Sequence, residues 1–225
     1  MNMQIELCPR LHELPVNTLI TFGKFKINNT ESLEDIIWRI VAKNHPNYPS
    51  DSVTLVSENI IEYMPFMNME TEKLNNYYDS GIRKWLNGRF FADFNPNHIS
   101  DIIPTDISGV QDFAFLLSED DLSLFECNSN KFAKPTNQLK NYMLHYYGTR
   151  NLDKVNNYIP YWLRTADSIS EYFVSIMPRS FDKELSEVKP VNQHVKNFSG
   201  VRPVLNVTGK TIVFTNKDGL YEVIW

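Results

Sequence analysis

The chain has 225 residues, of which 42% are hydrophobic, 13% aromatic and 22% charged. A chain of this length can bury a large core, and this composition is far from that of disordered proteins. The formal net charge of -5 is scattered without a run of like charges, so the clustered cations that bind nucleic acid are not expected. We therefore expect one folded domain over residues 1–225.

The first predicted elements are strands. Residues 16–27 mix β-branched and aromatic side chains around Gly23, which indicates a strand or hairpin. Residues 36–41 and 53–57 are two further apolar segments, separated by a proline-containing turn at 44–52. The order of these segments predicts a β-meander.

The middle of the chain predicts three helices. From Thr71 onwards, apolar residues recur at spacings of three and four and would share one helix face: Leu74, Tyr78, Ile82, Trp85 and Leu86. Gly88 stands where this helix would end. A second helix is expected over 119–127 with Ser118 as its N-cap, and a third over 137–147 before Gly148.

The C-terminal third predicts mostly strands. The segments are 161–165, 172–177, 200–207, 211–215 and 220–225. Turns are expected around Gly209 and at 216–219. Together with the helices, this pattern predicts an α+β domain with mostly antiparallel sheet and two or three helices.

The sequence contains no familiar catalytic or metal-binding motif. Its glycines are isolated, so no phosphate-binding loop is present, and its five histidines form no pair at helical ligand spacing. Cys8 and Cys127 are too far apart to indicate a disulfide framework, and we expect both to be small buried or half-buried side chains. We expect no cofactor and no metal.

Three segments place an arginine inside an apolar run: Ser80–Asn87, Tyr161–Thr165 and Gly200–Leu205. In one interpretation, Arg83, Arg164 and Arg202 meet at an anion-binding site. In the other, each guanidinium group extends to the surface or pairs with a buried carboxylate, while Trp85 and Trp162 fill the core. We favour the second, structural interpretation.

With Phe115–Ser118 between them, these segments resemble a bacterial and phage family of uncharacterised domains. The pattern of that family runs S-x-I-R-x-W-L-N, F-L-L-S, W-L-R-[ST] and G-V-R-P-x-L, and the resemblance covers residues 16–207. Its members look like relatives of the C-type lectin-like fold of formylglycine-generating enzymes and some phage receptor-binding proteins. The resemblance therefore implies a C-type lectin-like fold.

In such folds, the loops before the final G-V-R-P strand contact ligands, which corresponds here to residues 166–199. The resemblance thus implies a set of candidate binding residues: Arg179, Phe181, Asp182, Lys183, Glu184 and His194. The alternative is that 178–196 is only a solvated connection. No cysteine follows Cys127 and the segment 95–97 lacks an acid, which disfavours copper oxidase chemistry and calcium-dependent sugar binding.

We expect a non-catalytic binding protein of bacterial or phage origin that acts on another protein. It would be an inhibitor of a host defence system or a phage structural or receptor-binding component. The alternatives are an enzyme that uses His98 or His145 with an acid, and a module that binds glycans through exposed aromatic rings. The sequence has neither an apolar leader nor a long apolar segment, so we expect a cytoplasmic protein without a membrane partner.

Overall fold

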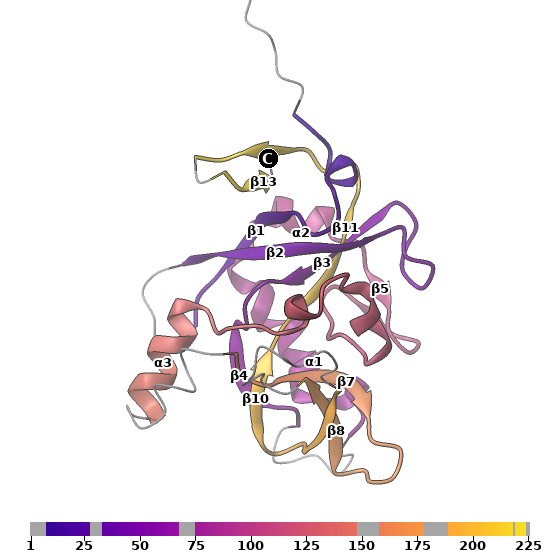
Figure 1. Ribbon diagram of the computed structural model, residues 1–225, viewed down its shortest axis with the longest axis vertical. Helices are drawn as coiled ribbons and strands as arrows, with labels where there is room; N and C mark the ends of the chain where they lie inside the picture. Colours follow the sequence, from indigo (N-terminus) through magenta and orange to yellow (C-terminus); the bar gives the residue numbers. More distant parts are fainter. Residues whose placement is uncertain are drawn as a thin grey trace, which may run out of the picture.

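The computed structural model describes residues 8–27, 33–67, 75–147, 158–177, 189–217 and 219–223. These residues form a mixed α and β structure in which two main sheets lie one above the other (Figure 1), which confirms the predicted α+β class. Within the described part, no helix is both long and apolar enough to cross a membrane.

The larger sheet begins with the predicted meander. Strands β1 (Leu19–Phe25), β2 (Glu34–Lys43) and β3 (Ser52–Ser57) are consecutive antiparallel neighbours. Along β2 the apolar side chains alternate towards the core, and Trp38 is fully buried with its indole N–H donated to the Phe22 carbonyl at 2.7 Å. The β-meander prediction is therefore confirmed.

Both ends of the chain contribute to this sheet, whose order is β11-β3-β2-β1-β13-β12. Strand β13 (Tyr221–Val223) runs parallel to β1, and β12 (Val213–Thr215) pairs with its outer side. On the other side, β11 (Val204–Thr208) pairs with β3. The first and last described strands thus lie side by side.

The smaller sheet has the order β4-β10-β7-β8-β9. Its strands are β4 (Glu62–Pro65), β7 (Tyr161–Ala166), β8 (Phe173–Met177), β9 (Val191–His194) and β10 (Phe198–Val201). A separate two-stranded ribbon joins β5 (Thr105–Asp106) to β6 (Gln111–Asp112). The sequence did not predict β4, β5, β6 or β9.

The single strand predicted over 200–207 is wrong. The segment forms β10 and β11, which belong to different sheets and are separated by Arg202 and Pro203. Proline has no backbone N–H to donate to a sheet, so a strand ends readily at Pro203. The break lets one short segment connect both sheets.

The helices are short. The α-helices are α1 (Gly81–Leu86), α2 (Pro96–Asp101) and α3 (Asn137–Tyr147), and the last confirms the prediction. The 3-10 helices are η1 (Leu11–Glu13), η2 (Tyr77–Asp79), η3 (Arg89–Asp93), η4 (Asp120–Leu124) and η5 (Asn128–Lys131). In Figure 1, α3 projects from the side of the molecule.

Two predicted helices differ from the structure. Within the predicted helix from Thr71, Ser80 adopts an extended conformation and its side chain caps α1 by accepting from the Arg83 N–H, so η2 and α1 are separate. The helix expected over 119–127 is only the 3-10 helix η4. The N-cap of η4 is Glu119 and not the predicted Ser118, although the Ser118 hydroxyl accepts from the Asp121 N–H at 3.2 Å.

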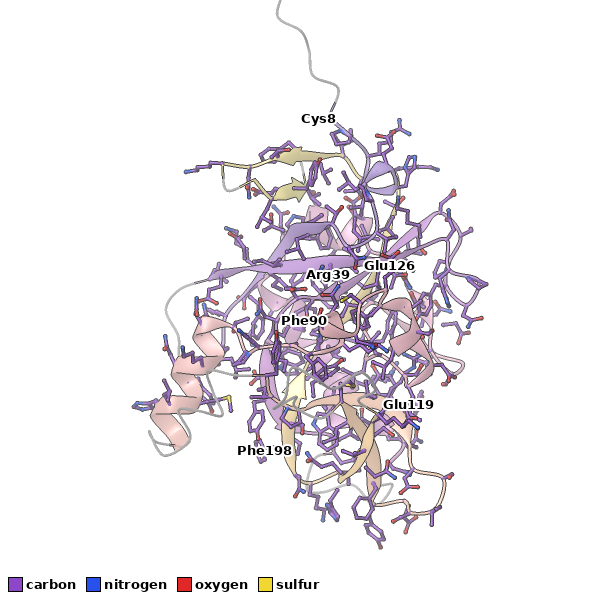
Figure 2. The ribbon with its side chains drawn as sticks, in the orientation of Figure 1. Cys8, Arg39, Phe90, Glu119, Glu126 and Phe198 are labelled. Carbon is purple, nitrogen blue, oxygen red and sulfur yellow. The ribbon has the colours of Figure 1, made fainter. Side chains whose placement is uncertain are left out.

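The expected burial of the two cysteines is also wrong. Cys8 and Cys127 are both exposed, and Figure 2 shows Cys8 beyond the larger sheet at the start of the described chain. Cysteine 8 precedes the first helix and Cys127 lies between η4 and η5, so neither is on a strand or helix face that packs against the core.

Candidate functional site

Two of the motif arginines pair with buried carboxylates. Arg83 holds Asp112 with contacts of 3.0 Å from Nε and 2.7 Å from Nη2, and Asp112 is fully buried. Arg164 holds Asp121 at 2.6 Å. Burial raises the pKa of Asp112. Burial also acts to raise the pKa of Asp121, but the charge of Arg164 and the hydrogen bonds from Ser118 outweigh it, so the pKa of Asp121 is lowered.

Arg202 has a different environment. Its side chain is 1% exposed, and it donates to the carbonyls of Ser57 at 2.8 Å and Asn130 at 3.0 Å. The guanidinium group lies between the rings of Phe125 and Tyr161, 5.1 and 5.4 Å from their centroids. Each of the three arginines is therefore held by its own protein partners rather than at a shared anion site. The structural interpretation does not fit Arg202 in detail, because its guanidinium group neither reaches the surface nor pairs with a carboxylate among the described residues.

Most of the candidate binding residues from the resemblance cannot be placed. Arg179, Phe181, Asp182, Lys183 and Glu184 lie outside the described residues. His194 is described, at the end of β9. The structure therefore tests the candidate binding segment only at its two ends, 166–177 and 189–199.

His194 belongs to a cluster of aromatic side chains. Its ring stacks at 6.1 Å and 17° on Tyr172 and meets Phe173 edge-on at 5.6 Å. Tyr172 is 46% exposed, and the nearby Ile169 is 94% exposed. We call this surface the β8–β9 face, and its residues are Asp167, Ile169, Tyr172, Phe173, Asn192 and His194.

Polar contacts fix the β8–β9 face. Asn192 donates its amide N–H to the Asp167 carboxylate at 2.9 Å, and the Asn75 amide donates to the carbonyls of Asp167 and Ser170. The Ser175 hydroxyl on β8 donates to the Glu119 carboxylate. The loop that carries the exposed Ile169 is thus tied at several points, which lowers the entropy cost of binding there.

Among the described residues, β9 is the edge strand on one side of the smaller sheet. In the described chain it pairs only with β8, and Val191 at its start is 49% exposed. The opposite edge strand, β4, is more protected, because its four residues are half-buried and the Met64 carbonyl accepts the Trp162 indole N–H at 2.8 Å. Figure 2 places Phe198 and Glu119 on opposite sides of this sheet.

Two cavities lie away from this face. The larger, about 500 Å³, lies between the start of β2 and the N-terminus of α3, where burial raises the pKa of Glu34 although the Gln138 N–H donates to it. The second, about 390 Å³, lies between β1 and α2 and contains His98. Burial, aided by the charge of Lys24, lowers the pKa of His98 to about 4.

No group of metal ligands forms in the described part of the chain: three or more His, Cys, Asp or Glu side chains nowhere gather suitably for an ion. Sequence reasoning identified His194 but missed Tyr172, Ile169 and Asn192. The available signal was the exposed-looking hydrophobic residue Ile169 in the polar stretch 166–171.

Comparison with known proteins gives a family match without a characterised relative. The model of a family described as a domain of unknown function, DUF6273, matches residues 51–209. No curated protein and no solved structure matches the chain. The expectation of an uncharacterised domain family is confirmed, and the match leaves β1, β2, β12 and β13 outside the family segment.

Proposed function

Since the chain belongs to the DUF6273 family, whose function is unknown, we propose its function from its own surface: it is a non-catalytic protein that binds another protein through the β8–β9 face. The proposal keeps the bacterial or phage origin, the cytoplasmic location and the C-type lectin-like fold that the sequence resemblance implies. Two sheets joined by long irregular connections are compatible with that fold.

The observation that carries the proposal is β9, whose outer edge pairs with no other strand in the described part of the chain, beside exposed, preordered aromatic side chains. An unpaired strand edge offers backbone donors and acceptors that an extended segment of another protein satisfies best. The rings of Tyr172 and His194 supply flat contact area with few rotatable bonds. The partner would add a strand at β9 and place an apolar side chain against these rings.

An inhibitor is the role that we propose first. A protein that masks one extended segment of a host defence protein needs only such a face, without an active site. A phage structural or receptor-binding component is the alternative within the same class, and the identity of the captured partner separates the two roles.

In the first experiment, random extended peptides displayed on phage are selected for binding to the purified protein. In the second, the protein captures partners from a lysate of the producing cells. Tyr172→Ala alters the β8–β9 face, and Val191→Lys alters the exposed start of the edge strand β9. Phe214→Ala is the matched control, because Phe214 is an exposed aromatic residue on β12, the edge strand of the other sheet.

We expect the wild type and Phe214→Ala to bind one peptide motif and one partner that contains it. Tyr172→Ala and Val191→Lys should bind neither. The pair is then rebuilt from purified components to measure Kd. If folded wild-type protein selects no motif, or if all three variants bind equally, the proposal is wrong.

A second candidate is glycan binding at the same face. The observation in its favour is the row of amide and carboxylate groups from Asn192 and Asp167 beside the stacked ring of Tyr172, a combination that can hydrogen-bond sugar hydroxyls and stack on a sugar ring. A glycan array decides it: binding that is lost in Tyr172→Ala and in Asp167→Asn supports this candidate, and a blank array with folded protein contradicts it.

A further inference from the structure

The cavity between β1 and α2 is built from segments that are distant in the sequence. One wall consists of Thr21–Lys24 of β1 with Asp35 and Glu222, and the other consists of Asp93–Pro96 with His98. Its volume, about 390 Å³, lies within the range of small-molecule sites. The second wall lies inside the family segment 51–209, whereas the first lies outside it. The cavity thus combines residues from inside and outside the family segment.

Aromatic rings line the inner end of this cavity. The rings of Phe22 and His98 lie 4.6 Å apart, and Phe94 meets Phe22 edge-on at 6.2 Å. Gly23 has a φ of +74°, and the Phe94 ring lies where a Cβ at Gly23 would stand. Only glycine lets the ring pack this closely on β1. These rings give the cavity an aromatic wall in which they are inclined to one another.

The polar rim of the cavity is acidic. Its charged side chains are one lysine and three acids: Lys24, Asp35, Asp93 and Glu222. Lys24 pairs with Asp35 at 3.1 Å, and Asp93 pairs at 2.9 Å with Arg89, which does not line the cavity. Among the described residues, no hydrogen bond or ion pair engages the Glu222 carboxylate. Because burial and Lys24 keep the pKa of His98 low, its ring adds no positive charge at neutral pH.

We propose that this cavity binds a small organic cation that carries a flat apolar group. The ammonium or amidinium group lies at the rim beside Glu222 and Asp93, and the apolar group lies against the rings of Phe22, Phe94 and His98. A cation is attracted electrostatically by both the carboxylates and the faces of the aromatic rings, whereas an anion would be repelled by the net negative rim. A bare metal ion fits less well, because no group of metal ligands gathers there in the described chain.

The test measures Kd by titration calorimetry at pH 7 and low salt for three probes of similar size: benzyltrimethylammonium, benzyl alcohol and benzoate. We expect binding of the cation, and no measurable binding of the neutral or anionic probe. Glu222→Gln should weaken the cation about tenfold or more, as expected for loss of one close charge. Glu171→Gln, an exposed acid in the loop before β8, is the matched control and should bind like the wild type.

Lys24→Gln gives an independent check in the opposite direction. Lys24 is the only cationic side chain among the described residues that line the cavity, and its removal also frees Asp35, so the cationic probe should bind several-fold more tightly. Melting temperatures of all variants confirm that they are folded. The proposal is wrong if folded wild-type protein does not bind the cation, if the neutral probe binds equally well, or if Glu222→Gln leaves Kd unchanged. None of these outcomes depends on the β8–β9 face.

Discussion

At the scale of single residues, His98 makes stability depend on pH. Burial lowers its pKa to about 4, while the unfolded chain has the ordinary value of about 6.5. Between about pH 6.5 and about pH 4, His98 is protonated in the unfolded state but stays neutral in the folded state. The free energy of unfolding should therefore decrease over this window by up to about 3 kcal/mol.

The measurement is chemical denaturation at pH 7 and pH 4.5 for the wild type and His98→Gln. The difference between the two proteins is the useful quantity, because Glu34, Glu62, Asp101 and Asp112 have raised pKa values and act in the opposite direction in both. We expect the stability advantage of the wild type to shrink at the lower pH. An advantage that stays constant would contradict a neutral, buried imidazole.

Cys127 should be the more reactive thiol of the chain. The Ser129 side chain lies 2.9 Å from its sulfur, and this contact together with the Ser129 N–H lowers the pKa of the thiol. Iodoacetamide at pH 7, followed by mass spectrometry, should modify Cys127 faster than Cys8, which is also exposed. Ser129→Ala should slow the alkylation of Cys127 and leave that of Cys8 unchanged. If Cys127 reacts at the same rate in the wild type and in Ser129→Ala, Ser129 does not activate this thiol.

At the scale of the elements, Trp162 joins two strands of the smaller sheet. It is fully buried on β7, its indole N–H bonds to Met64 on β4, and its ring meets Phe66 edge-on at 5.5 Å. Trp162→Ala should lower the free energy of unfolding by about 3 to 5 kcal/mol, because it removes a large core ring. Trp162→Phe keeps most of the ring and should cost less. Denaturant titrations compare them, and unchanged stability in the alanine variant would be incompatible with this packing.

The elements that the sequence predicted well are those with a clear apolar pattern. The meander was predicted from segments rich in β-branched and aromatic residues separated by turn residues, and these segments form the largely buried strands β1, β2 and β3; α3 forms where the third helix was expected. The long helix failed at Ser80, where a single capping side chain outweighs a continuing apolar spacing. Strand β9 reads Val-Asn-Gln-His and has no apolar alternation; within the described residues it is an edge strand whose four side chains are exposed or half-buried.

The candidate sites were predictable only in part. The resemblance identified His194, but its neighbour Tyr172 depends on the register of β8 and β9, which the sequence does not state. The cavity depends on still longer contacts, since His98 and Glu222 are brought together by α2 and β13. No local pattern contains such a pairing, so only the structure reveals it.

At the scale of the whole molecule, the family segment 51–209 should not fold alone. Strands β1 and β2 supply core residues, among them Ile20, Phe22 and Trp38, and β2 pairs with β3 inside the segment. Removing them exposes one side of β3 and much of the core. We expect poorly dispersed amide signals by NMR for the fragment 51–209 and good dispersion for residues 8–223. A fragment that unfolds cooperatively on heating would refute this dependence.

The parallel pairing of β1 with β13 can form only late in translation, after β13 has been synthesised. Ile20 pairs with Tyr221, so about 200 further residues must be synthesised before β1 gains its second neighbouring strand. At about 5 to 20 residues per second this takes on the order of 10 to 40 seconds, during which one edge of β1 stays unpaired on the ribosome. Because an unpaired strand edge can pair with another chain, the nascent chain exposes a site for association with its neighbours on the polysome during this period.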